Sequence, residues 1–152
     1  MTRLTGLAPL VTPATRVLVL GSFPGLRSLQ RQQYYAHPQN QFWPVLRALW
    51  PQAPWPADGD YAGRCACALA QGLGIWDVYA SCERSGSLDS AIRQAQLNDF
   101  PALLRALLEH RPDVAVVAVR PAPYYAPRPY YGPPAYRGYG YGPGYGYGYR
   151  RW

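Results

Sequence analysis

The sequence contains no lysine, and all 15 of its basic residues are arginine. Schiff-base catalysis uses the amine of a lysine side chain, so its absence excludes lysine-based covalent chemistry in this chain. Cysteine and histidine are also scarce, with three and two residues. An iron–sulfur cluster would need four cysteines, and Cys65-x-Cys67 is poor spacing for zinc. We therefore expect reduced, incidental thiols, no metal and no cofactor.

Long apolar runs are missing as well. No stretch approaches the roughly 20 apolar residues that a membrane-spanning helix needs, and Pro9 and Pro13 break the weakly apolar N-terminus. That terminus has no convincing apolar core or cleavage site of a signal peptide. We expect a cytoplasmic protein with no membrane partner.

Acidic residues are few, but the excess of basic residues is unevenly placed. The chain has 8 acidic residues and a net charge of +7. Five of the arginines lie in residues 120–152, which contain no acid, so residues 1–119 carry ten basic and eight acidic residues. The body of the chain is therefore only mildly basic, at +2, and its composition alone does not identify a DNA-binding protein.

The sequence changes character at residue 120. Residues 120–152 contain ten Tyr, seven Gly, seven Pro and five Arg, and no aliphatic residue larger than Ala. Such a segment cannot bury a periodic apolar face, so we predict a domain over residues 1–119 and a disordered tail over 120–152. Arginines interleaved with tyrosines can bind single-stranded nucleic acid, and the alternative is a solvated segment without function.

Within residues 1–119, apolar patterns of strand length alternate with patterns of helix length. This order predicts an α/β fold, a three-layer α/β/α arrangement with a mostly parallel sheet. The expected elements, in chain order, are a strand over 16–20, helices over 42–50 and 61–72, a strand or strand and loop over 74–80, a polar turn over 81–89, a helix capped by Asn98, and a buried strand over 114–119.

A glycine-containing loop, Gly21-Ser22-Phe23-Pro24-Gly25, directly follows the first predicted strand. Its glycines let the backbone approach a ligand at the carboxyl end of a strand, where open α/β sheets bind ligands. Residues 34–43 (YYAHPQNQFW) then combine aromatic rings, a histidine and three amides. These groups suit a pocket for a flat, uncharged, hydrogen-bonding molecule such as a nucleobase. The alternative is an aromatic turn packed on the core.

The spacing of these residues resembles motif 1 of the uracil-DNA glycosylase superfamily. The pattern GS-x-PG…SL…YYAHP-x-N-x-FW has the form found in the hypoxanthine (deoxyinosine) DNA glycosylases, and the mismatch-specific uracil/thymine glycosylases share its frame. The segment GIWDVYASCERSGSLDSAIR is similar to one that lies beside the pocket in the hypoxanthine branch. The resemblance covers roughly residues 10–119. The family's last strand and its second motif, a loop that enters the DNA minor groove, have no counterpart, so the implied fold is C-terminally incomplete.

The resemblance implies roles for individual residues. Tyr35 would stack under a base flipped out of DNA, and Asn40 would position the attacking water or the base edge. His37 is a candidate proton donor to the leaving base, and Phe23 stands where the mismatch-specific relatives have their water-activating Asn. The implied catalytic residues are Asn40 and His37, and the implied substrate-binding residues are Gly21, Ser22, Phe23, Pro24, Gly25, Tyr35, Phe42 and Asp77.

Each polar residue of this set also has a structural alternative. Asn40 could clamp its own loop, and His37, next to a proline, could serve only as a hydrogen-bond partner. Asp77 could orient a water or pair with an arginine, or it could be a helix cap or a structural ion-pair partner.

Three hypotheses for the function follow. The first is a monofunctional, monomeric DNA glycosylase that acts on DNA containing deaminated bases, in the cytoplasm of a bacterial cell at the nucleoid. The second is an inactive, truncated or fused member of that family, because the second motif is absent. The third is a nucleic-acid-binding protein that works through residues 120–152, with binding that is sensitive to salt.

Overall fold

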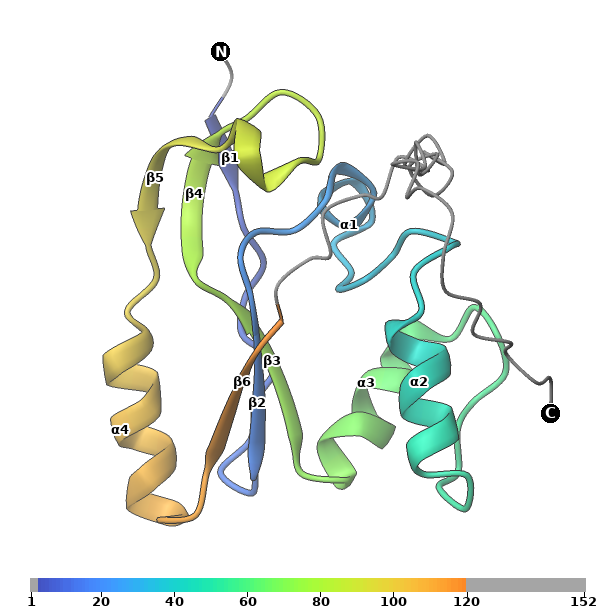
Figure 1. Cartoon of the computed structure of the whole chain (residues 1–152). Helices are drawn as coiled ribbons and strands as arrows, with labels where there is room; N and C mark the ends of the chain where they lie inside the picture. Colours follow the sequence, from blue (N-terminus) through green and yellow to red (C-terminus); the bar gives the residue numbers. More distant parts are fainter. Residues whose placement is uncertain (1–2, 120–152) are drawn as a thin grey trace, which may run out of the picture. The chain divides into compact units, whose positions relative to one another are not determined.

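The central sheet contains the two apolar runs predicted to be strands, at 16–20 and 114–119, together with residues 73–77. The computed structural model describes residues 3–119. In it β2 (Val17–Gly21) lies between β3 (Leu73–Asp77) and β6 (Ala115–Ala118), and all three strands are parallel (Figure 1). Gly21 pairs with Asp77 at the carboxyl ends of β2 and β3. The register therefore places the glycine loop and the Asp77 carboxylate at the same edge of the sheet.

Helices cover both faces of this sheet, as Figure 1 shows. Alternate residues of β2 point to opposite sides, because successive side chains of a strand do. Val19 packs in a core with Trp43 and Cys65, whereas Leu18 packs with Leu107. The predicted three-layer α/β/α fold is thereby confirmed. The helices are α1 (Leu26–Arg31), α2 (Phe42–Leu49), α3 (Tyr61–Ala70) and α4 (Phe100–His110), with α2 and α3 on one face and α4 on the other.

A second sheet, which the sequence did not predict, extends the molecule beyond the carboxyl edge of the first. It is antiparallel, with β4 (Tyr79–Glu83) between β1 (Arg3–Thr5) and β5 (Arg93–Leu97), and the short helix η1 (Asp89–Ala91) precedes β5. The prediction of a polar turn over 81–89 is therefore wrong for its first three residues. All of β5 is exposed, so its residues carry no hydrophobic alternation that would identify a strand.

Two further predictions need correction. The N-cap of α4 is Asp99, whose carboxylate accepts a hydrogen bond from the Ala102 N–H at 3.0 Å. The Asn98 amide instead donates to the backbone carbonyl of Asp77 at 2.9 Å. An Asx side chain at either of two adjacent positions could cap a helix, and the sequence does not distinguish them.

Strand β6 was predicted to be buried, but all four of its residues are exposed. The reason is its place in the sheet. Among residues 3–119 no strand lies beyond β6, whereas the outer edge of β3 is covered by Leu10, which exchanges backbone hydrogen bonds of 2.9 and 2.8 Å with Ile75. Val116 and Val117, one on each face, are 40% and 47% exposed.

The three cysteines are unpaired and buried, two in α3 and one in β4, at Cys65, Cys67 and Cys82. None of the described helices is long and apolar enough to cross a membrane. The tail predicted over residues 120–152 lies outside the described residues.

Candidate functional site

A cavity of about 610 Å³ opens at the carboxyl edge of β2 and β3. The glycine loop forms one wall, and the segment between α1 and α2 forms another. All ten residues predicted for the site line it, namely Gly21, Ser22, Phe23, Pro24, Gly25, Tyr35, His37, Asn40, Phe42 and Asp77. The structure thus brings them together in one place, and the role of each residue stays a prediction.

Tyr35 has a backbone conformation that is unusual for a bulky residue. Its φ of 55° lies in the left-handed region, which costs energy for any residue with a side chain. Its ring stacks on that of Phe42, with centroids 3.9 Å apart and planes 22° apart. Burial, and then the Asp77 carboxylate, raise the pKa of the Tyr35 phenol, so it stays neutral. The strained backbone therefore holds an uncharged two-ring stack at the cavity.

Asn40 serves as a clamp at the start of α2. Its side-chain oxygen accepts a hydrogen bond from the Phe42 N–H at 2.8 Å, and its own N–H donates to the His37 carbonyl at 2.9 Å. The structural alternative for Asn40 is thus present. The oxygen keeps a second lone pair, and the amide nitrogen has no partner among the described residues, so both groups can still serve a ligand.

His37 lies exposed at the mouth of the cavity. Its Nδ1 accepts a hydrogen bond from the Gln39 N–H at 3.2 Å. In a neutral imidazole the proton is then on Nε2. His37 therefore offers one N–H donor to a ligand.

Asp77 is the buried charge-bearing group of the cavity. The residue is 6% exposed, and its Oδ2 has no hydrogen-bond partner within residues 3–119. Burial and then the neighbouring Asp89 carboxylate raise the pKa of Asp77 to about 7, against the opposing effect of Arg84. Its Oδ1 occupies the space where a side chain of residue 21 would begin, which explains why Gly21 is glycine.

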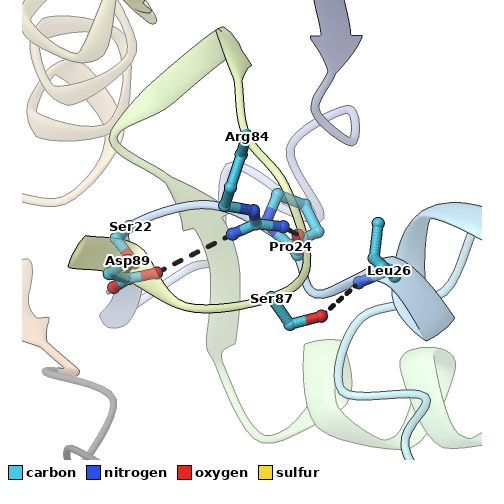
Figure 2. Close-up of polar contacts among 6 residues, drawn as sticks. All are labelled: Ser22, Pro24, Leu26, Arg84, Ser87 and Asp89. Carbon is cyan, nitrogen blue, oxygen red and sulfur yellow. Dashed lines mark hydrogen bonds and ion pairs between the residues drawn. The ribbon is translucent and has the colours of Figure 1, made fainter. Parts of the chain in front are cut away.

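The residue that sequence reasoning missed is Arg84, whose guanidinium lies beside Pro24 of the glycine loop (Figure 2). Its guanidinium donates a hydrogen bond to the Pro24 carbonyl, and its central carbon lies 5.0 Å from the centroid of the Phe23 ring. Its Nη1 lies 3.8 Å from Asp89 Oδ1. The side chain is completely buried.

Ser87 and Asp89 attach the same segment to the loop at two further points. The Ser22 hydroxyl donates to the Asp89 carboxylate, and the Leu26 N–H donates to Ser87 Oγ at 3.0 Å (Figure 2). The RSGSLD pattern had placed this segment beside the pocket. No sequence signal indicates which of its side chains reach back 60 or more residues to the loop.

Comparisons with known proteins identify the family of the chain. The family model of the uracil DNA glycosylase superfamily matches residues 8–135. A hypoxanthine DNA glycosylase from Methanosarcina barkeri is 33% identical over 98 residues, which cover 64% of this chain and 61% of the relative. One from Methanosarcina acetivorans is 36% identical over 90 residues, covering 59% and 55%. The chain thus spans less than two thirds of the length of either curated relative.

A solved structure is also similar. A solution NMR structure from Methanosarcina acetivorans, whose description as a uracil DNA glycosylase is provisional, matches with a TM-score of 0.62 and 29% identity. The match covers 77% of this chain and 70% of that one. The chain belongs to the uracil DNA glycosylase superfamily, and its similarity to the hypoxanthine DNA glycosylases confirms the branch that its motif indicated.

Proposed function

We propose that this protein is a DNA glycosylase that hydrolyses the N-glycosidic bond of a deaminated base, hypoxanthine or uracil, flipped out of DNA. The observation that carries the proposal is the cavity, where two stacked rings, an amide and a buried carboxyl group lie beside a glycine loop in a chain of this superfamily. A duplex hides the reacting atoms of a base, so an enzyme of this kind needs a pocket for the extruded nucleotide.

Asp77 supplies the hydrogen-bonding group that suits these bases. With a pKa of about 7, it is protonated in mildly acidic solution and then offers one donor and one acceptor. Hypoxanthine and uracil both present an N–H beside a C=O, which is the complementary pair. An ionised carboxylate would repel that carbonyl oxygen. Tyr35, stacked on Phe42, provides the flat surface under the ring.

The reaction adds water across the bond between the base and C1′ of the sugar. Hydroxide from the water ends on C1′, and the proton ends on the base, which leaves as a neutral molecule. Asn40, through the free lone pair of its oxygen, holds the water, and the Nε2–H of His37 hydrogen-bonds the leaving base. Backbone N–H groups of the glycine loop stabilise the negative charge that develops on the base. Without lysine, the chain releases the base and leaves the sugar-phosphate backbone intact.

The test is release of free base from oligonucleotides that contain inosine or uracil. We expect release that falls as the pH rises through about 7, because Asp77 ionises. Asp77→Asn keeps one donor and one acceptor and should retain release at pH 8, whereas Asp77→Ala should lose it. Folded wild-type protein that releases neither base would refute the proposal.

The second hypothesis, an inactive relative, is favoured by the exposed edge of β6. An exposed apolar strand at the end of a sheet is typical of a sheet from which the next strand is missing. Attaching a family-like C-terminal half in place of residues 120–152 distinguishes the two cases. If only the extended chain releases base, the chain as it stands is inactive.

Four expectations stay predictions. We propose that the protein is a monomer, that it acts in the cytoplasm at the nucleoid, and that residues 120–152 bind nucleic acid. The fourth expectation is a bacterial source, whereas the curated relatives are from Methanosarcina.

A further inference from the structure

Arg84 is a buried cation whose hydrogen-bonding capacity is mostly unused. Its side chain is 0% exposed, yet Nε and Nη1 make no hydrogen bond within the described structure. A buried guanidinium loses its hydration, and one ion pair at 3.8 Å recovers only part of that free energy. An apolar side chain of similar size would fill this place at lower cost, so stability does not explain an arginine here.

The contacts that Arg84 does make all concern the glycine loop. The guanidinium binds the Pro24 carbonyl and lies against the Phe23 ring, while its ion-pair partner Asp89 accepts a hydrogen bond from the Ser22 hydroxyl. Three consecutive loop residues are thus held by one pair of opposite charges. Arg84 itself does not line the cavity, but its partner Asp89 and the three loop residues that the pair holds do.

We propose that Arg84 and Asp89 are positioning residues of the candidate site, which fix the glycine loop as a wall of the cavity through the Pro24 carbonyl and the Ser22 hydroxyl. The role rests on the proposed function, since a rigid loop matters where its N–H groups must meet developing charge. Arg84 lies outside the cavity, and Asp89 lies on its wall, where its carboxylate binds the Ser22 hydroxyl and pairs with Arg84.

The pair has a second effect, on Asp77. Asp89 raises the pKa of Asp77 and Arg84 lowers it. The other titratable groups that face Asp77 are the Tyr34 and Tyr35 phenols, which burial keeps neutral. The positioning pair therefore acts on Asp77 with opposite signs. Removing one member shifts the Asp77 titration in a direction that depends on which member is removed.

The experiment compares three variants of the full chain: Arg84→Met, Arg84→Lys and Asp89→Asn. Arg93→Met is the control, because it removes an exposed arginine that binds only neighbouring carbonyls. Amide exchange at Leu26, whose N–H binds Ser87, reports how firmly the segment holds the loop. We expect exchange to be on the order of tenfold faster in all three variants, from loss of one charge-assisted hydrogen bond, and unchanged in the control.

The titration of the Asp77 carboxyl, followed by NMR, separates positioning from general loosening. We expect a midpoint above about 7 in Arg84→Met, below it in Asp89→Asn and unchanged in Arg84→Lys. Loosening of the fold would hydrate Asp77 and lower the midpoint in every variant. Lower midpoints throughout, or unchanged exchange at Leu26, would overturn the proposal. If Arg84→Met does not fold, Arg84→Lys and Asp89→Asn still decide it, because faster exchange is expected in both and a lower midpoint only in Asp89→Asn.

Base release completes the test and keeps the two proposals apart. In a wild-type enzyme that is active, we expect kcat to fall in the three variants and KM to change little, because the loop acts in the transition state. If wild type releases no base, the proposed function fails, while the exchange and titration results still judge the positioning role.

Discussion

Asp77→Asn should change how the stability of the protein depends on pH. The wild-type carboxyl titrates near 7 in the folded chain, against 3.8 for an ordinary aspartate. Between these values the folded protein binds one more proton than the unfolded chain. The contribution of this carboxyl group to the free energy of unfolding is therefore greatest below about pH 4, falls as the pH rises, and levels off above about 7. An asparagine at this position has the same shape and does not titrate.

The size of the effect follows from the two acid constants. Each tenfold difference between them is worth 1.36 kcal/mol, so the full difference from 3.8 to about 7 is on the order of 4 kcal/mol. About two of these pH units lie above pH 5. Between pH 5 and pH 8 the wild type should thus lose about 3 kcal/mol relative to Asp77→Asn.

Urea unfolding of both proteins at pH 5 and pH 8 measures this difference. Asp58→Asn is the matched control, because its side chain is 97% exposed and its removal should leave the pH dependence unchanged. Parallel stability curves for wild type and Asp77→Asn would show that Asp77 is already ionised at pH 5. The account of the cavity as a neutral site would then be wrong.

Three further substitutions test the geometry. Gly21→Ala places a methyl group against the Asp77 carboxylate and should cost about 1–3 kcal/mol in urea unfolding. Gly25→Ala meets Ser87 Oγ only at 3.6 Å and should cost no more than about 1 kcal/mol, because glycine is preferred to alanine at the N-cap of α1. Asn40→Ala should lose about 1 kcal/mol of stability because the Phe42 N–H loses its partner, and Asn40→Asp, which retains the acceptor, should unfold like wild type. Val117→Lys changes a position on β6 that is 47% exposed, so the free energy of unfolding should stay within about 0.5 kcal/mol of wild type. The added charge should reduce the association of protein molecules that light scattering detects at high concentration. A large loss of stability would show that this edge is covered.

The sequence predicted the elements whose own residues carry an apolar pattern. The runs at 16–20 and 114–119 form β2 and β6, and the apolar face of residues 42–50 forms α2. The antiparallel sheet was missed because β5 is exposed along its whole length and is held by backbone pairing with β4. Backbone pairing by itself does not require the alternation of apolar and polar residues that identifies a strand in a sequence. The exposure of β6 was missed because a run of valines and alanines is compatible both with a strand at the edge of a sheet and with a strand at its centre.

The candidate site was predicted as far as it lies in one continuous motif. Residues 21–43 contain nine of the ten expected cavity residues, and the resemblance fixed their spacing. The contacts of Arg84 and Asp89 with the loop join residues 60 or more positions apart. Such partners are defined by the fold, because only the pairing of β2 with β3 brings the two segments to the same edge.

The three buried cysteines lie in two different layers of the protein, so their reactivity can report the local opening of each layer. Cys65 and Cys67 lie in α3 of the parallel-sheet layer, and Cys82 lies in the antiparallel sheet. All three side chains are buried, which limits access, and burial also raises the pKa of their thiols, so we expect a thiol reagent to react when the surrounding layer opens. Pulse labelling followed by peptide mapping would time the opening of each half of the molecule separately, without any introduced probe. Equal labelling rates at Cys67 and Cys82 would mean that the two sheets come apart as one cooperative unit.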